Sequence, residues 1–181
     1  MKSGKGYSVV QQYDDDVLND AVEFLEHRTD DRPLMLTGGF VSPHPPYIAR
    51  PELFEYYYDQ LEDPIQEETF EETLHPAIAD WRKRRNVSDV TIEEWRRVRA
   101  AYYANVQDLD ERVGKIMETV ERTLGLDNTI LVYVSDHGDS IGINNLIWKT
   151  TFFDTSVKIP FLAAGPGIGE AAPRPAVQLG R

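Results

Sequence analysis

Cysteine is absent from the 181 residues of this chain. Disulfide bonds, thiolate metal sites and a cysteine nucleophile are therefore excluded within it, while the redox state of its compartment stays undecided. Long apolar runs are also missing, since none approaches the roughly 20 residues that cross a bilayer. The first residues lack the apolar segment of a signal peptide, so we expect a cytoplasmic location.

Positive charge is scarce: 19 lysines and arginines face 31 aspartates and glutamates, which gives a net charge of -12. Nucleic acids and anionic membranes are polyanions, so this balance predicts neither as a partner. Hydrophobic residues make up 41% of the chain, which argues against intrinsic disorder. Length and composition together predict one folded domain with a real core.

The most informative stretch runs from residue 129 to residue 149. Its apolar run at 130–134 predicts a strand buried on both faces of a parallel sheet. Asp136 and His137 follow this strand directly, where α/β sheets bind their ligands. A carboxylate and an imidazole on adjacent residues can reach one cation if the backbone turns, and Gly138 allows that turn.

Two further strands are predicted at 34–41 and 158–164. The first leads into a loop in which three prolines surround His44, and such a loop is too stiff to join a sheet or a helix. We therefore expect His44 at the same sheet edge as Asp136 and His137.

Helices are predicted at 14–26 and at 91–124. The second carries a Thr91–Glu94 capping signature, apolar residues at steps of three and four, and Gly125 as its stop. Residues 51–81 hold ten acidic residues and no lysine or arginine, and we read them as a long excursion with short elements. Arginines and lysine at 82–85, 96, 97 and 99 could bind nucleic acid, but we favour pairing with that excursion or exposure to solvent.

Four side chains follow strands and could do chemistry: His44, Asp136, His137 and Lys149. Each also has a structural explanation. His44 could be a surface residue, Asp136 could cap a turn, and Lys149 could lay its stem on Trp148.

Several segments, in chain order, resemble motifs of the sulfatases. Residues 42–47 (SPHPPY) resemble SPHxPY, residues 103–114 resemble YxAxVxxLDxxVG, and residues 126–139 resemble GLxDNTIVVFTSDHGD. Residues 149–153 and 157–168 are similar to KxTFYExSVRVPLxxxGPGI. The branch indicated is that of choline-sulfatases and phosphonate monoester hydrolases in the alkaline phosphatase superfamily.

This resemblance implies an α/β fold: a partial alkaline-phosphatase-like sandwich with a mostly parallel sheet flanked by helices, incomplete on its N-terminal side. Residues 1–169 would form the C-terminal half of a sulfatase catalytic domain, and residues 170–181 an irregular tail.

The resemblance also implies roles for single residues. Asp136 and His137 would bind a divalent cation, calcium in the first place and manganese as the alternative. His44 and Lys149 would be catalytic and would contact the oxygens of a small anionic sulfate ester. Asn144 stands where relatives carry a histidine, so a substrate contact there would be altered.

Sulfatases make a formylglycine nucleophile within a CxPSR-like segment, and this chain contains no such segment. We therefore expect a sulfuric ester hydrolase that is inactive as this chain alone, completed by another chain or by a homo-oligomer. Two alternatives stay open: a phosphonate monoester or phosphodiester hydrolase, and a non-catalytic sulfatase remnant that serves as an interaction module.

Overall fold

The computed structural model describes residues 2–169, and the predicted tail at 170–181 lies outside these residues. The described chain divides into two compact units. Residues up to 60 together with 100–129 form the first unit, and residues 61–99 with 130 onward form the second. Within residues 2–169 no helix combines the length and the apolar character needed to cross a membrane.

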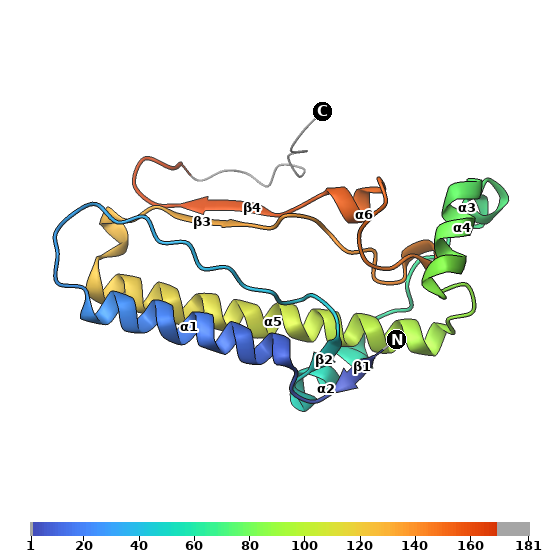
Figure 1. Ribbon diagram of the computed structural model, residues 1–181, viewed down its shortest axis with the longest axis horizontal. Helices are drawn as coiled ribbons and strands as arrows, with labels where there is room; N and C mark the ends of the chain where they lie inside the picture. Colours follow the sequence, from blue (N-terminus) through green and yellow to red (C-terminus); the bar gives the residue numbers. More distant parts are fainter. Residues whose placement is uncertain (1, 170–181) are drawn as a thin grey trace. The chain divides into compact units, whose positions relative to one another are not determined.

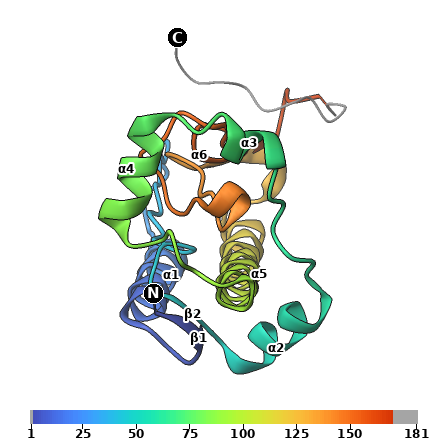
Figure 2. The same cartoon turned by 90° about the vertical axis from the view of Figure 1, so that its right-hand side faces the viewer.

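The first unit is built on two helices that lie side by side, α1 (Val9–His27) and the greater part of α5 (Ile92–Thr123) (Figures 1 and 2). Its smaller elements are β1 (Ser3–Lys5), β2 (Tyr47–Ala49), α2 (Pro51–Gln60) and a 3-10 turn at Leu126–Asn128. Buried apolar side chains from both long helices form its core, among them Leu18, Leu25, Ala104 and Leu109.

Both predicted helices are confirmed. Helix α1 begins five residues earlier than predicted, because Ser8 and Gln11 form a capping box ahead of the apolar stripe. At the start of α5, the backbone N–H of Glu94 donates to Thr91 Oγ1 over 3.3 Å, and Thr91 N–H donates to the Glu94 carboxylate over 2.8 Å. Gly125 ends this helix with φ +79°, a left-handed conformation that glycine adopts readily.

The second unit contains α3 (Glu68–Glu72), α4 (Pro76–Arg85), a 3-10 turn at Ile143–Asn145, β3 (Leu131–Val134), α6 (Asp154–Val157) and β4 (Phe161–Ala164). Arginines of the basic stretch pair with nearby acids, as predicted. Arg82 binds both carboxylate oxygens of Glu71 at 2.9 Å, and Arg96 lies 2.7 Å from Asp63.

The predicted mostly parallel sheet is wrong for the described residues. Two separate two-stranded sheets are present: β1 pairs with β2 in parallel, and β3 pairs with β4 antiparallel, with Leu131 opposite Ala164. The predicted burial of β3 is also wrong, since Val132 and Val134 are 57% and 50% exposed. An apolar run indicates a strand that favours burial. Its actual burial requires other elements of the chain to pack on both of its faces.

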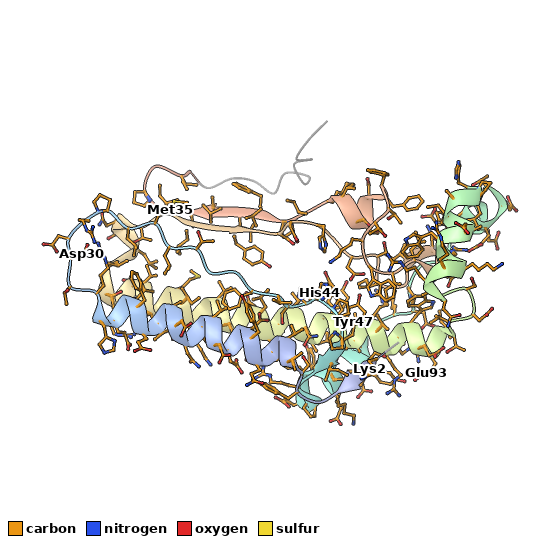
Figure 3. All side chains as sticks on the ribbon, viewed as in Figure 1. Lys2, Asp30, Met35, His44, Tyr47 and Glu93 are labelled. Carbon is orange, nitrogen blue, oxygen red and sulfur yellow. The ribbon has the colours of Figure 1, made fainter. Side chains whose placement is uncertain are left out.

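The predicted strand at 34–41 is not formed. Residues 28–46 run without regular structure past Asp30, Met35 and His44 until β2 begins (Figure 3). A strand is stable only when its N–H and C=O groups pair with a neighbour. Within residues 2–169 no strand pairs with this segment.

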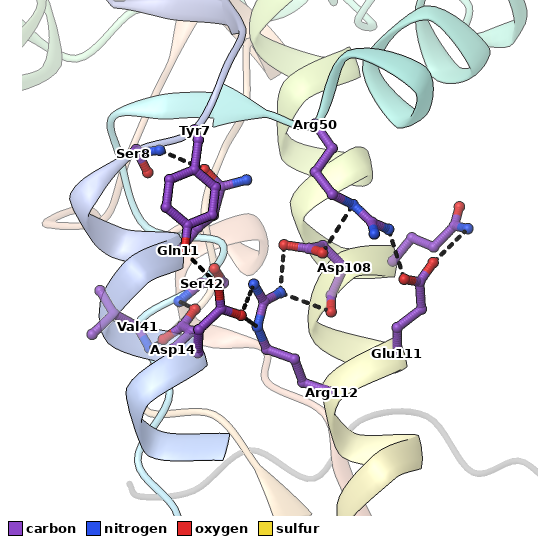
Figure 4. A network of polar contacts seen from close by, with 12 residues as sticks. Tyr7, Ser8, Gln11, Asp14, Val41, Ser42, Arg50, Asp108, Glu111 and Arg112 are labelled. Carbon is purple, nitrogen blue, oxygen red and sulfur yellow. Dashed lines mark hydrogen bonds and ion pairs between the residues drawn. The ribbon is translucent and has the colours of Figure 1, made fainter. Parts of the chain in front are cut away.

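A polar network with Asp108 and Arg112 buried at its centre crosses the first unit (Figure 4). Arg112 of α5 donates two hydrogen bonds to Asp15 of α1, at 3.0 and 2.7 Å, and pairs with Asp108. Arg50 extends the network with contacts of 3.1 Å to Asp108 and 2.6 Å to Glu111. The network therefore ties α1 and the start of α2 to α5.

Candidate active site

Asp136 and His137 stand directly after β3. His137 Nδ1 lies 2.9 Å from the carbonyl oxygen of Gly138, which only accepts hydrogen bonds. Nδ1 therefore carries the hydrogen, and Nε2 keeps its lone pair in the neutral ring. That Nε2 is 3.5 Å from Asp136 Oδ2. One imidazole nitrogen and one carboxylate oxygen thus lie close enough for a single cation to contact both.

This pair fits a divalent cation. Two donors ~2.4 Å from a cation, at right angles to each other, lie about 3.4 Å apart. The Asp136 side chain is 84% exposed and that of His137 is 35% exposed, so both are accessible to an ion. Calcium prefers six to eight oxygen ligands. No cluster of three or more histidines and acids suited to a metal occurs in the part of the chain that the structure describes. The two residues would therefore hold a cation only as part of a larger ligand set.

Gly138 fixes the path of the backbone after this pair. Its N–H donates to the carbonyl of Ser156 over 2.8 Å. A Cβ at this position would lie 2.2 Å from the carbonyl oxygen of Thr155, which no side chain can tolerate. Glycine is required here for close approach to α6.

Asp139 was not assigned a role from the sequence, yet it organises the loop that reaches Lys149. Its Oδ1 accepts the N–H of Ile141 at 3.1 Å and that of Trp148 at 2.8 Å. Trp148 has a positive φ of 62°, so this hydrogen bond stabilises an unusual backbone turn just before Lys149. In the sequence Asp139 is visible only as the last acid of the SDHGD segment. That position does not indicate a hydrogen bond to Trp148, nine residues away.

Lys149 is half-buried, and within residues 2–169 it makes no ion pair or side-chain hydrogen bond. The cation that lies over the Trp148 ring is the guanidinium of Arg85, at 5.6 Å from the ring centre. The Lys149 ammonium therefore has no structural partner among the described residues.

Asn144 has a clear structural function. Its side-chain oxygen accepts the N–H of Glu67 at 2.9 Å, and its own N–H donates to the carbonyl of Ile65 over 3.0 Å. Its φ of 52° is one that asparagine tolerates better than most residues. Asn144 thus anchors the segment before α3, and a contact between it and substrate remains a prediction.

His44 belongs to the first unit, whereas Asp136, His137, Asn144 and Lys149 belong to the second. Its side chain is exposed in the loop before β2 (Figure 3). His44 Nδ1 lies 2.8 Å from the carbonyl oxygen of Pro45, so Nδ1 carries the hydrogen and Nε2 is the nitrogen available to a ligand. The meeting of His44 with the other four residues stays a prediction.

Known proteins match this chain along most of its length. Residues 2–178 match the Sulfatase family. The chain is 38% identical over 170 residues to a choline-sulfatase of Rhizobium meliloti. The aligned region makes up 87% of this chain and 32% of that protein. An arylsulfatase of Clostridium perfringens is 28% identical over 162 residues, or 83% and 31% of the two chains. The chain thus spans about a third of the length of these curated relatives.

Solved structures show the fold. A phosphonate monoester hydrolase of Agrobacterium radiobacter superposes with a TM-score of 0.77 at 22% identity, covering 92% of this chain and 37% of that one. The predicted alkaline-phosphatase-like fold is therefore confirmed as a partial one, mostly helical in the described residues and with only small sheets. From the family match over residues 2–178, the chain belongs to the sulfatase family.

Proposed function

We propose that this chain supplies part of the active site of a metal-dependent sulfuric ester hydrolase similar to choline-sulfatase. The observation that carries the proposal is the Asp136–His137 pair, with its Nε2 and Oδ2 atoms 3.5 Å apart and the other ring nitrogen engaged by Gly138. A ligating histidine needs this kind of second hydrogen bond to fix its tautomer. When bound, the cation would polarise the sulfate ester.

The chain's own residues have distinct tasks in this proposal. Lys149 contributes a positive point charge to the ester oxygens, where negative charge grows in the transition state. His44 holds Nδ1–H on the Pro45 carbonyl, so its Nε2 in the protonated ring is the atom that donates a proton to the departing alkoxide.

The nucleophile is proposed to come from outside these residues. The formylglycine of the sulfatases requires a CxPSR-like segment, and the 181 residues contain none. Additional cation ligands are needed as well, because Asp136 and His137 supply only two. A complementing polypeptide would provide both, whereas a second copy of this chain could add cation ligands but no such segment.

Hydrolysis of phosphonate monoesters is the second candidate. It is favoured by the superposition on the phosphonate monoester hydrolase, whereas the sequence identity of 38% favours sulfate esters. Both substrates present a tetrahedral anion to the same charges.

A chimaera tests the proposal. Residues 2–169 replace the matching segment of the Rhizobium meliloti choline-sulfatase, and the product is assayed with choline sulfate, an aryl sulfate and a phosphonate monoester. We expect sulfate ester hydrolysis. Lys149→Ala should lower kcat about 100-fold or more, the cost of removing one oxyanion-stabilising group. Lys83→Ala is the matched control, because Lys83 is exposed on α4.

Each result of this assay has a defined meaning. A folded chimaera that hydrolyses only the phosphonate supports the second candidate. One that binds calcium and hydrolyses no ester contradicts the proposal and supports a non-catalytic module.

A further inference from the structure

The loop that carries His44 is anchored by a buried carboxylate on α1. Asp14 is 0% exposed, and each of its oxygens accepts one backbone N–H (Figure 4). Oδ1 accepts that of Val41 at 2.7 Å, and Oδ2 accepts that of Ser42 at 3.0 Å. The carboxylate therefore holds two consecutive peptide groups at the point where the long irregular segment arrives at the His44 loop.

The chemistry of Asp14 shows that this contact is specific. A buried carboxylate is strongly destabilising unless hydrogen bonds replace its hydration. Within residues 2–169 Asp14 makes no ion pair, so the hydrogen bonds from the two amides replace the hydration that its carboxylate loses on burial. The next two acids on α1 do not contact this loop in the same way: Asp15 pairs with Arg112, and Asp16 is exposed.

A second anchor lies on the other side of His44. Tyr47 N–H donates to the carbonyl of Lys2 over 3.2 Å, and β2 continues in parallel pairing with β1. Between the anchors, His44 N–H donates to the Val41 carbonyl over 3.0 Å. Prolines at 43, 45 and 46 restrict the remaining backbone angles. The backbone that carries the imidazole is thus held from both ends, and the ring itself is oriented by its contact with the Pro45 carbonyl.

We propose that Asp14 is the positioning residue of His44. By holding the amides of Val41 and Ser42 it keeps the imidazole in the orientation in which Nδ1–H meets the Pro45 carbonyl and Nε2 points away. The catalytic meaning of this orientation rests on the proposed function, whereas the anchoring itself does not.

The test compares Asp14→Asn with Asp16→Asn in the ¹⁵N-labelled chain. An asparagine at 14 keeps one acceptor oxygen and replaces the other by an NH₂ group. We expect hydrogen exchange at Val41 or Ser42 to become about tenfold faster, as befits the loss of one hydrogen bond. The ring ¹⁵N shifts of His44 should move toward the average of the two tautomers. Asp16→Asn should change neither quantity.

Unchanged exchange and ring shifts in Asp14→Asn would overturn the proposal, and so would equal changes in Asp16→Asn. If Asp14→Asn does not fold, the unaltered chain still decides. In the chain labelled with both ¹³C and ¹⁵N, scalar couplings across the hydrogen bonds are expected from the amide nitrogens of 41 and 42 to the Asp14 carboxylate carbon, and their absence refutes the anchor.

Activity is read separately in the choline-sulfatase chimaera. Asp14→Asn should lower kcat there while leaving the Kd for calcium unchanged, because Asp136 and His137 are not touched. An intact anchor in a chimaera without esterase activity counts against the proposed function alone, and a lost anchor in an active chimaera counts against Asp14 alone.

Discussion

The two histidines of the proposed site are oriented in the same way. Each places Nδ1 within hydrogen-bonding distance of the carbonyl oxygen of the next residue, Pro45 for His44 and Gly138 for His137. This local contact selects the tautomer without any distant partner. In both rings Nε2 is therefore the nitrogen left outside this contact, and the proposed function assigns it proton donation in His44 and metal binding in His137.

Asp139 is expected to be essential for the turn before Lys149. Asp139→Ala removes the acceptor for the N–H groups of Ile141 and Trp148 and should destabilise the second unit by ~1–3 kcal/mol. All three tryptophans lie in that unit, at 81, 95 and 148, so fluorescence-detected urea unfolding measures the loss. The control is Asp89→Ala, an exposed acid of the same unit. Equal losses in both variants would contradict the role of Asp139.

The Glu71–Arg82 pair should make the second unit sensitive to acid. Hydrogen bonds from Arg82 hold the pKa of Glu71 below its usual 4.5. A lowered carboxylate pKa contributes stability above the unfolded value, and this stability is lost as the pH falls through the folded value. We expect Glu71→Gln to cost ~0.5–1 kcal/mol at pH 7, because the Glu71 side chain is half exposed, and almost nothing at pH 3.

Urea unfolding of the original chain and the variant at both pH values checks this difference. Glu72→Gln, an exposed neighbour, serves as the control. A pH-independent cost at position 71 would show that charge is not the source of the effect.

Among the elements, the contact between the loop after β3 and α6 depends on one missing side chain. Gly138→Ala would bring a Cβ to 2.2 Å from the Thr155 carbonyl and should destabilise the second unit by ~2–3 kcal/mol. Gly114 lies within α5 with no atom near its would-be Cβ. Gly114→Ala should therefore stabilise that helix by about 1 kcal/mol.

Opposite signs for these two Gly→Ala changes are the expected result. Tryptophan fluorescence follows the second unit, and far-ultraviolet circular dichroism follows α5. A neutral Gly138→Ala would mean that the loop does not pack on α6.

The molecule as a whole should bind metal weakly and hydrolyse no sulfate ester as these 181 residues alone. Two ligands cannot satisfy calcium, so we expect a Kd of ~100 µM or weaker. Isothermal titration with Ca²⁺ and with Mn²⁺ measures it, and His137→Gln should abolish the remaining heat. A tight single site, or turnover of an aryl sulfate, would refute this prediction.

The sequence by itself determined the two long helices, the cap of α5 and the family. Helix α5 was predicted to within a residue at each end because the Thr91–Glu94 box, the apolar stripe and Gly125 all act over three or four positions. Composition predicted that the basic stretch faces the acidic excursion or solvent, and the structure supplied the partner, Glu71 for Arg82. The order of the sulfatase motifs likewise needed no coordinates.

Tertiary structure alone decided which strands formed and which carboxylates were structural. Strands were predicted both at 34–41 and at 130–134, yet only the second has a partner strand among the described residues. Asp14 and Val41 are 27 positions apart, and Asp139 and Trp148 are nine apart. Such hydrogen bonds form because folding brings an acceptor next to a distant N–H group. A local sequence pattern cannot predict which residues come together in this way.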